Sequence, residues 1–174
     1  MIDTKVINNF VSDKNLLEHF YYNYIINGRI DLSFKNKGYE HENPHSFTSS
    51  KNSNNFDEIY LIHVLYHKIK KNFIQSNVKR WHLNVYPPGF DGTIHTDSKS
   101  VELPTFLYCV TPNWQKEWGG EFIIYDHSFQ ASEVVSFNED QLIVFDGSKP
   151  HRAVASTKNC PILRTTLAFH EYDK

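Results

Sequence analysis

The chain has 174 residues, of which 40% are hydrophobic and 22% are charged, the profile of one globular domain with a sizeable core. Its formal net charge of −2 argues against general binding to nucleic acid or to an anionic membrane surface. The two cysteines are too few for a disulfide framework and predict a reducing compartment, the cytoplasm.

The sequence shows neither a targeting segment nor a membrane segment. The first residues lack the charged and then apolar run of a signal peptide, and no apolar run approaches the length of a membrane span. Heavy use of Asn, Lys and Ile indicates an AT-rich coding genome, and we expect a microbe or its phage as the source.

The N-terminal part is predicted to contain two helices. An extended lead-in at residues 6–11 precedes a helix that Ser12 caps and that continues to about Ile26. A second helix begins at or near Asp57, and its apolar residues recur at helical spacing as far as Phe73.

The segment between the two helices, residues 29–55, is rich in Asn, Ser and Lys. We interpret it as a long loop with one short strand near residues 30–34. Because loops of this length in compact domains are often functional, it is a candidate lid over a substrate pocket.

Two histidines, His63 and His67, lie four residues apart on one face of the second helix, a spacing that can bind metal. No Glu follows His63, and the sequence indicates no third ligand nearby. We therefore interpret the pair as helix-surface histidines.

From residue 78 onward the hydrophobic pattern changes to a period of two. Within residues 78–86, one face carries Trp81, Leu83 and Val85. The opposite face carries polar and aromatic side chains, those of Arg80, His82, Asn84 and Tyr86. We expect the apolar face to meet the helices and the other face to line an interior cavity.

Further short strands, separated by turns, follow to the end of the chain. They are expected at residues 103–110, 121–125, 134–135, 142–145, 150–154 and 164–170. Two helices followed by about eight short strands predict a mainly β fold with N-terminal helices, a double-stranded β-helix (jelly roll) braced by two helices. We expect a single domain, residues 1–174, in which residues 1–77 supply helical support and a loop and residues 78–174 form the jelly-roll core.

The stretch of residues 86–97 contains the only His-x-Asp of the chain, His95-x-Asp97. On an extended segment, residues two apart point to the same side, so both side chains could reach one ion. Roughly one His-x-acid is expected by chance in a chain of this composition, so the tripeptide alone carries little weight. A third ligand must come from elsewhere, and the sequence leaves His127 and His151 as candidates. Two histidines and one carboxylate would leave open positions on the metal, as non-haem Fe(II) oxygenases need.

The order of these residues resembles that of the Fe(II)/2-oxoglutarate-dependent dioxygenases. In that family a His-x-Asp pair, here His95-x-Asp97, is followed by a later histidine and by an arginine on a late strand, which match His151 and Arg164. The Trp-Gly-Gly-Glu segment at residues 118–121 resembles the prolyl 4-hydroxylase-like branch, in which a Gly-Gly pair opens the strand after the first two ligands. The likeness extends over more than half of the chain.

The resemblance implies that His95, Asp97 and His151 bind Fe(II). It also implies that 2-oxoglutarate and O2 take the remaining positions on the metal. Arg164 would bind the far carboxylate of the cosubstrate, for which its charged, planar fork is suited. Ascorbate is expected to assist as a reductant of the iron.

Further residues are expected around 2-oxoglutarate. Tyr86 and Asn84 share a face and lead into the His-x-Asp stretch, and in the family a Tyr or an Asn-x-Tyr at this place hydrogen-bonds the cosubstrate. On the last strand, Thr166 and His170 share a face with the arginine, and Thr166 is a candidate contact.

A tyrosine on the strand of residues 103–110 completes the predicted pocket. Tyr108 matches a pocket tyrosine of the family if the two sequences align without a gap. A slip of one residue would place Cys109 there instead, because adjacent residues of a strand face opposite ways.

The resemblance implies a reaction as well as a site. The enzyme would decarboxylate 2-oxoglutarate oxidatively to succinate and CO2 and would place a hydroxyl on an unactivated C–H bond. The expected target is a prolyl residue in a peptide or protein.

Three other functions fit parts of the sequence. An AlkB-like nucleic-acid demethylase shares Asn-x-Tyr before His-x-Asp, but the acidic balance and the Trp-Gly-Gly-Glu segment argue against it. A small-molecule hydroxylase would have the same core, because substrate choice depends on loops. The non-enzyme alternative is a jelly-roll binding module, and the complete set of His95, Asp97, His151 and Arg164 argues against it.

Overall fold

The structure is a computed structural model, and it describes residues 2–28, 55–98, 103–126 and 128–171. Most of the predicted lid, with its short strand, lies outside the described residues. Within the described ranges, no helix is both long enough and apolar enough to cross a membrane.

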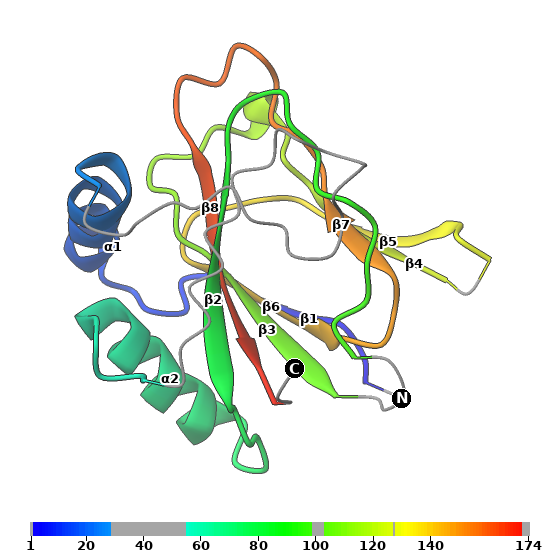
Figure 1. Cartoon of the computed structure of the whole chain (residues 1–174), viewed down its shortest axis with the longest axis horizontal. Coiled ribbons are helices and arrows are strands. Elements are labelled where there is room, and N and C mark those ends of the chain that lie inside the picture. Colours follow the sequence, from blue (N-terminus) through cyan, green and yellow to red (C-terminus); the bar gives the residue numbers. More distant parts are fainter. Residues whose placement is uncertain (1, 29–54, 99–102, 127, 172–174) are drawn as a thin grey trace.

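In the described parts of the chain, eight strands form two antiparallel sheets (Figure 1). The larger sheet has the order β1-β6-β3-β8-β2 and consists of β1 (Lys5–Ile7), β6 (Gln141–Asp146), β3 (Pro104–Cys109), β8 (Arg164–His170) and β2 (Arg80–Tyr86). The smaller sheet has the order β5-β4-β7 and consists of β5 (Ala131–Val135), β4 (Phe122–Tyr125) and β7 (His151–Ala153). This arrangement confirms the predicted mainly β, double-sheet fold.

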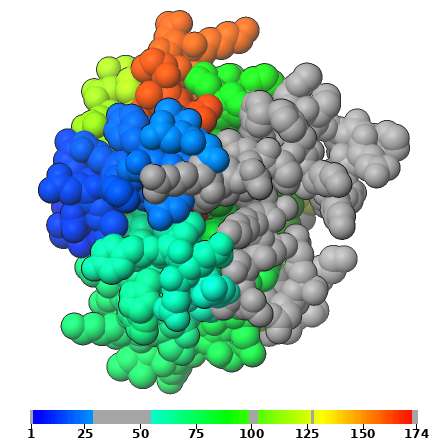
Figure 2. Space-filling model, turned by 60° about the vertical axis from the view of Figure 1, so that its left-hand side comes forward, coloured from blue at the N-terminus to red at the C-terminus, as the bar shows by residue number. Residues whose placement is uncertain are grey.

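The two predicted helices lie against the larger sheet (Figure 1). The first is α1 (Lys14–Phe20), which continues as the π-helical turn η1 (Tyr21–Ile26), and the second is α2 (Tyr60–Asn72). α1 and α2 lie side by side on the surface (Figure 2). A short 3-10 helix, η2 (Lys116–Trp118), precedes β4.

The cap of the first helix is Asp13, and the prediction of Ser12 is wrong. The Asp13 carboxylate accepts a hydrogen bond of 3.0 Å from the Leu16 N–H, as an N-cap side chain does. Ser12 lies one residue earlier with φ +60°, and its hydroxyl donates to the Asn9 carbonyl in the preceding turn. The Ser12 hydroxyl is therefore hydrogen-bonded to the turn before the helix and does not cap the helix.

The edge strand β2 has a different environment on each of its two faces. Trp81, Leu83 and Val85 are buried in the cluster that also contains the apolar side chains of α1 and α2, which confirms the predicted helix-facing side. A second buried cluster, including Leu107 of β3 and Phe122 of β4, joins the inner faces of the two sheets. The interior between the sheets is thus a separate compartment from the helix-covered core.

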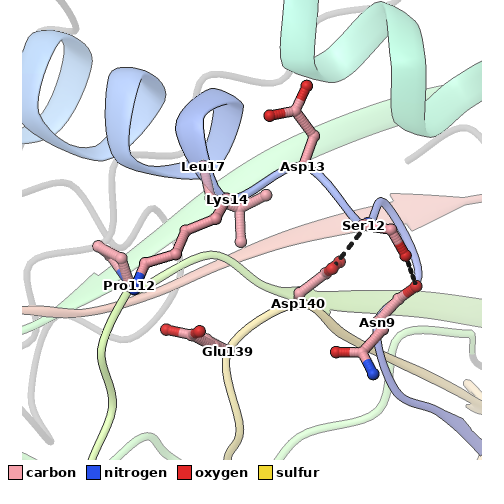
Figure 3. A pocket seen from close by; sticks show the side chains of 8 residues that line it. All are labelled: Asn9, Ser12, Asp13, Lys14, Leu17, Pro112, Glu139 and Asp140. Atoms are coloured by element: carbon pink, nitrogen blue, oxygen red, sulfur yellow. Dashed lines mark hydrogen bonds between the residues drawn. The ribbon is translucent and has the colours of Figure 1, made fainter.

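One buried carboxylate fixes the chain that enters α1. Asp140, which lies just before β6, accepts a hydrogen bond from the Val11 N–H at 2.7 Å. It also accepts one from the Ser12 N–H at 2.8 Å (Figure 3). The Tyr108 hydroxyl donates to the same carboxylate at 2.9 Å. Asp140 therefore connects the N-terminal segment to β3 and β6.

Substitution of Asp140 by Ala should lower the free energy of unfolding by about 2–4 kcal/mol, because three donors lose their acceptor in a buried setting. Tyr108→Phe removes only one of these bonds and should cost about 1 kcal/mol. Urea unfolding of both variants measures the difference. Equal losses in the two variants would contradict the role given to Asp140.

Candidate active site

The pocket between the two sheets is lined by the polar face of β2, as the period of two predicts. It also receives side chains from β3, β8 and the His-x-Asp stretch. Seven of the eight predicted site residues line it: His95, Asp97, His151, Arg164, Tyr86, Asn84 and Thr166.

Backbone hydrogen bonds hold the predicted metal ligands together. His95 and His151 form an antiparallel β-bridge, in which each N–H donates to the other residue's carbonyl, at 3.1 Å and 2.9 Å. The Asp97 N–H donates to the Gly147 carbonyl at 2.7 Å, in the turn that leads to β7. Two segments that are 56 residues apart, counted from His95 to His151, are thereby joined at the site.

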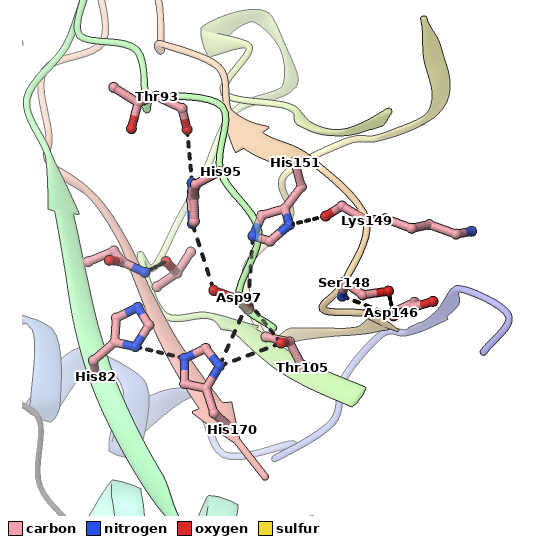
Figure 4. A network of polar contacts seen from close by, with 12 residues as sticks. His82, Thr93, His95, Asp97, Thr105, Asp146, Ser148, Lys149, His151 and His170 are labelled. Carbon is pink, nitrogen blue, oxygen red and sulfur yellow. Dashed lines mark hydrogen bonds and ion pairs between the residues drawn. The ribbon is translucent and has the colours of Figure 1, made fainter. Parts of the chain in front are cut away.

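Each histidine ring is oriented by its own backbone neighbourhood. His95 Nδ1 lies 2.9 Å from the Thr93 carbonyl, and His151 Nδ1 lies 2.8 Å from the Lys149 carbonyl (Figure 4). A carbonyl only accepts, so both Nδ1 atoms carry the proton and both Nε2 atoms offer a lone pair. This is the tautomer that a metal ligand needs.

The three offered atoms converge on one point. His95 Nε2 lies 3.8 Å from Asp97 Oδ1, and His151 Nε2 lies 3.5 Å from Asp97 Oδ2. The ligating atoms of the three residues all lie within 4.8 Å of one another. The side chains are 40%, 9% and 4% exposed for His95, Asp97 and His151, so the cluster is open only on the His95 side.

The protonation states also suit a cation. Burial lowers the pKa of His151 to about 4, although Asp97 opposes this shift. Burial by itself would raise the pKa of Asp97, but the rings of His151, His170 and His95 outweigh it and lower that pKa. At neutral pH an ionised carboxylate therefore faces a neutral imidazole, the forms in which both groups bind metal.

The donor set fits iron. Two imidazole nitrogens and one carboxylate oxygen, gathered on one side of a point, are the ligands of the Fe(II) facial triad and leave positions for other molecules. His95, Asp97 and His151 would hold the ion.

The Arg164 guanidinium is buried in the same pocket, with 1% of the residue exposed. Its Nε–H donates to the Gly120 carbonyl at 2.9 Å, and its Cζ lies 4.6 Å from the centre of the Phe137 ring. Within the described ranges no carboxylate lies close enough to form an ion pair with it. A buried cation without a counter-ion is costly, so the pocket is suited to an anionic ligand.

The Gly-Gly pair allows the chain to pass close to this arginine. Gly119 and Gly120 both have positive φ, +68° and +80°. A Cβ on Gly120 would lie 2.9 Å from Trp114 Cζ2 and 3.3 Å from Arg164 Cδ. Only glycine fits there, since a side chain would collide with the Trp114 indole.

Three other predicted residues stand around the arginine. Tyr86 lies directly opposite Arg164 in the pairing of β2 with β8, and burial raises its pKa, so it is a neutral phenol. Asn84 lies opposite Thr166 in the same pairing, and its amide lies 3.5 Å from the Thr166 hydroxyl. These groups can hydrogen-bond a polar ligand beside the guanidinium.

The prediction that Tyr108 lines the pocket is wrong. Tyr108 points to the helix side of the sheet, where it packs near Phe10 and donates to Asp140. Cys109 takes the inward position of β3, in the cluster between the sheets, and burial raises the pKa of its thiol to about 12. The alternation of side chains along a strand explains the difference of one residue.

The other histidine candidates differ in setting. His127 lies outside the described residues. His63 and His67 lie on α2, where Asp57 Oδ1 is 2.7 Å from His63 Nδ1. The ligating atoms of these three residues also lie within 4.8 Å of one another, but the Asp57 side chain is 81% exposed. A metal titration must therefore separate this exposed group from the buried one.

The pocket between the two sheets is small, with a volume of about 30 Å³. A larger cavity of about 320 Å³ lies at the start of α1, beside Asp13, Lys14 and Glu139 (Figure 3). That cavity contains none of the predicted site residues.

Sequence reasoning assigned no role to three residues that meet Asp97 directly or through a neighbour, Thr105, His170 and His82. Thr105 of β3 donates its hydroxyl to Asp97 Oδ2 at 2.8 Å. His170, whose ring is fully buried, has Nδ1 at 3.7 Å from the same oxygen, and its Nε2 lies 2.8 Å from His82 Nδ1. The only signal in the sequence was that His82 and His170 each occupy an inward position of a strand.

The core of the chain matches a known sequence family. The profile of the 2OG-Fe(II) oxygenase superfamily matches residues 81–170, just over half of the chain. The chain belongs to the 2OG-Fe(II) oxygenase superfamily. Membership makes it an oxygenase and implies Fe(II) and 2-oxoglutarate as its cofactor and cosubstrate. No curated protein sequence matches the chain.

Solved structures of other proteins share the fold of this oxygenase. A prolyl hydroxylase from Trichoplax adhaerens, in complex with a hypoxia inducible factor oxygen degradation domain peptide fragment, matches with a TM-score of 0.73 and 18% identity over 98% of this chain and 83% of that chain. A prolyl-4-hydroxylase from Pseudomonas putida matches with a TM-score of 0.68 and 13% identity over 98% of this chain and 93% of that chain. At these identities the likeness shows a shared jelly-roll fold.

Substitution of Gly120 by Ala should weaken the binding of 2-oxoglutarate to this oxygenase by roughly tenfold or more, because the added Cβ collides with Trp114 and crowds Arg164. Metal binding should be retained, since none of the three ligands touches Gly120. Calorimetric titration of the metal-loaded protein with 2-oxoglutarate, without O2, measures the effect.

A matched control separates the collision from backbone strain. Gly28 has φ +68°, and a Cβ there would have no atom of the described residues within 4 Å. Gly28→Ala therefore has the same kind of backbone strain without the collision, and 2-oxoglutarate should bind it as it binds wild type. Arg164→Ala, which removes the guanidinium, should weaken binding at least as much as Gly120→Ala. Wild-type affinity in Gly120→Ala would contradict the account.

Proposed function

We propose that this oxygenase hydroxylates a prolyl residue in a peptide or protein. In the proposed reaction one atom of O2 enters the new hydroxyl group. The other atom enters succinate, which forms with CO2 by oxidative decarboxylation of 2-oxoglutarate. Ascorbate, as a reductant of the iron, is part of the proposal.

The observation that carries the oxygenase chemistry is the pairing of two sites in one pocket. His95, Asp97 and His151 offer three metal ligands, and the Arg164 guanidinium has no carboxylate partner within the described ranges. A diacid can therefore bind the metal through its oxo-acid end and the guanidinium through its far carboxylate. 2-Oxoglutarate has this distribution of groups.

Each residue of the pocket has a separate task in this proposal. Bound Fe(II) would supply the activation of O2. Arg164 would hold the far carboxylate, and the Tyr86 phenol, neutral because of burial, can donate a hydrogen bond beside it. The closed surroundings of Asp97 and His151 exclude water from the reacting centre, which keeps the oxidant from side reactions.

Two features favour a peptide as the substrate. The site is open on the side of His95, where Ile94 is also 42% exposed, so a large molecule can reach the metal from that side. The fold is shared with prolyl hydroxylases over 98% of the chain, and one of those structures holds a bound peptide fragment. A prolyl side chain on an extended peptide is therefore the substrate class we propose.

A panel of proline-containing peptides tests the substrate. Wild-type protein with Fe(II), 2-oxoglutarate, ascorbate and O2 should add 16 mass units, one oxygen atom, to the prolyl residue of at least one peptide, with one succinate released per oxygen added. Tandem mass spectrometry locates the oxygen. The matched peptide with Ala in place of Pro should gain no oxygen.

His151→Ala controls for oxygen that is added without the enzyme, because it removes a metal ligand and should abolish both products. If wild type releases succinate while every prolyl peptide keeps its mass, the prolyl substrate is wrong, although the oxygenase activity stands.

A further inference from the structure

Two stacked histidines join the pocket wall to the carboxylate of the metal site (Figure 4). His82 of β2 and His170 of β8 have nearly parallel rings, with an interplanar angle of 7° and centroids 4.6 Å apart. His82 Nδ1 lies 2.8 Å from His170 Nε2, and the opposite nitrogen of His170, Nδ1, lies 3.7 Å from Asp97 Oδ2. The three side chains form one line from β2 to the metal site.

The same oxygen of Asp97 is held by Thr105. The Thr105 hydroxyl donates to Asp97 Oδ2 at 2.8 Å, and its oxygen lies 3.5 Å from His170 Nδ1. Oδ2 also lies 3.5 Å from His151 Nε2, whereas the other oxygen, Oδ1, lies 3.8 Å from His95 Nε2 and accepts no hydrogen bond from Thr105. The two carboxylate oxygens therefore have different surroundings.

One arrangement of protons satisfies all of these contacts. An ionised carboxylate only accepts, so the Thr105 hydroxyl donates its hydrogen bond to Asp97 and can accept a hydrogen bond from another donor. His170 Nδ1 faces two oxygens, so in the neutral ring it carries the proton and Nε2 offers a lone pair. His82 Nδ1–H then donates to that lone pair. The tautomers of both rings follow from the charge of Asp97.

We propose that His170, oriented by His82, is a positioning residue for Asp97. The Thr105 hydroxyl donates to Oδ2 and His170 Nδ1 faces the same oxygen at 3.7 Å, so that Oδ1 is left for the metal and the carboxylate binds iron through one oxygen. The inference rests on the proposed iron site.

Ligation through one oxygen matters for the proposed reaction. Fe(II) held by His95, His151 and one oxygen of Asp97 would have positions left for 2-oxoglutarate and O2. A carboxylate that rotated to bind through both oxygens would take one of these positions. Partners behind a metal ligand commonly change metal affinity by 10–100-fold when they are removed.

Matched substitutions at His170 test the inference. His170→Phe keeps a flat ring and removes both nitrogens, whereas His170→Asn keeps an N–H donor where Nδ1 lies. The full chain carries His63→Ala and His67→Ala throughout, so that the exposed group on α2 does not contribute. Mn(II), which is stable in air, is titrated into the metal-free protein, and unbound Mn(II) is measured by electron paramagnetic resonance.

We expect His170→Phe to weaken Mn(II) binding by about tenfold or more, and His170→Asn to stay within about threefold of wild type. The thermal unfolding of the metal-free variants is compared alongside. Wild-type affinity in His170→Phe would overturn the inference. So would an equal loss in His170→Asn and His170→Phe at equal unfolding temperature, because the lost donor would then not be the cause.

Substitutions of His82 provide a second test of the inference, which applies even if His170→Phe does not fold. His82 is only partly buried, and His82→Phe should weaken Mn(II) binding while His82→Asn, which keeps the donor, should not. Equal affinity of these two variants for Mn(II) would overturn the part played by His82.

The visible spectrum provides a second measurement. With Fe(II) and 2-oxoglutarate and without O2, the charge-transfer band of His82→Phe should shift and that of His82→Asn should not.

The parent protein, which carries only His63→Ala and His67→Ala, distinguishes failure of the iron site from failure of the positioning role. If the parent protein binds no Mn(II), the iron site fails and the inference fails with it. If the parent binds and the variants do not differ from it, only the positioning role of His170 and His82 fails.

Discussion

The alternation of side chains along β2, β3 and β8 is the constraint on which the site depends. In β8, Arg164 and Thr166 face the pocket between the sheets, whereas Leu167 and Phe169 pack under the helices. A shift of one residue in this strand would move the guanidinium into the apolar core and a leucine into the pocket. The burial of the helix-facing side chains therefore holds the register that positions the functional ones.

The metal ligands are held in another way, since His95 and Asp97 lie on an irregular segment and only His151 belongs to a strand, β7. The β-bridge between His95 and His151, and the hydrogen bond from Asp97 to Gly147, tie a loop to the start of β7. Side chains of the larger sheet thus form the part of the pocket that would bind 2-oxoglutarate. Backbone hydrogen bonds between the two segments hold the residues that would bind iron. The two parts meet where β2 runs into the His-x-Asp stretch.

The parts of the fold that obey a periodic rule could be predicted from the sequence. The two faces of β2 follow from the period of two, and the helices follow from the spacing of apolar residues. Details that depend on a single residue could not be predicted in this way. The helix cap is at Asp13 and not at Ser12, and the inward residue of β3 is Cys109 and not Tyr108, because neither composition nor spacing distinguishes adjacent positions of similar type.

Contacts between residues on strands that are far apart in the sequence also could not be predicted. Nothing in the chain indicated that Thr105 and His170 would meet at Asp97, because their proximity is a product of the pairing of β3 with β8. The site residues that a family resemblance could name lie in the pocket, apart from the one-residue difference on β3. What the resemblance could not supply is the set of groups that orient them.

The central claim is that one pocket holds Fe(II) and 2-oxoglutarate together, and the most direct measurement is the visible spectrum of the protein without O2. Addition of Fe(II) and 2-oxoglutarate should produce a metal-to-ligand charge-transfer band that neither addition produces alone. Admission of O2 should bleach the band and release succinate. A folded protein that shows no band with both additions, and no succinate with O2, would contradict the account.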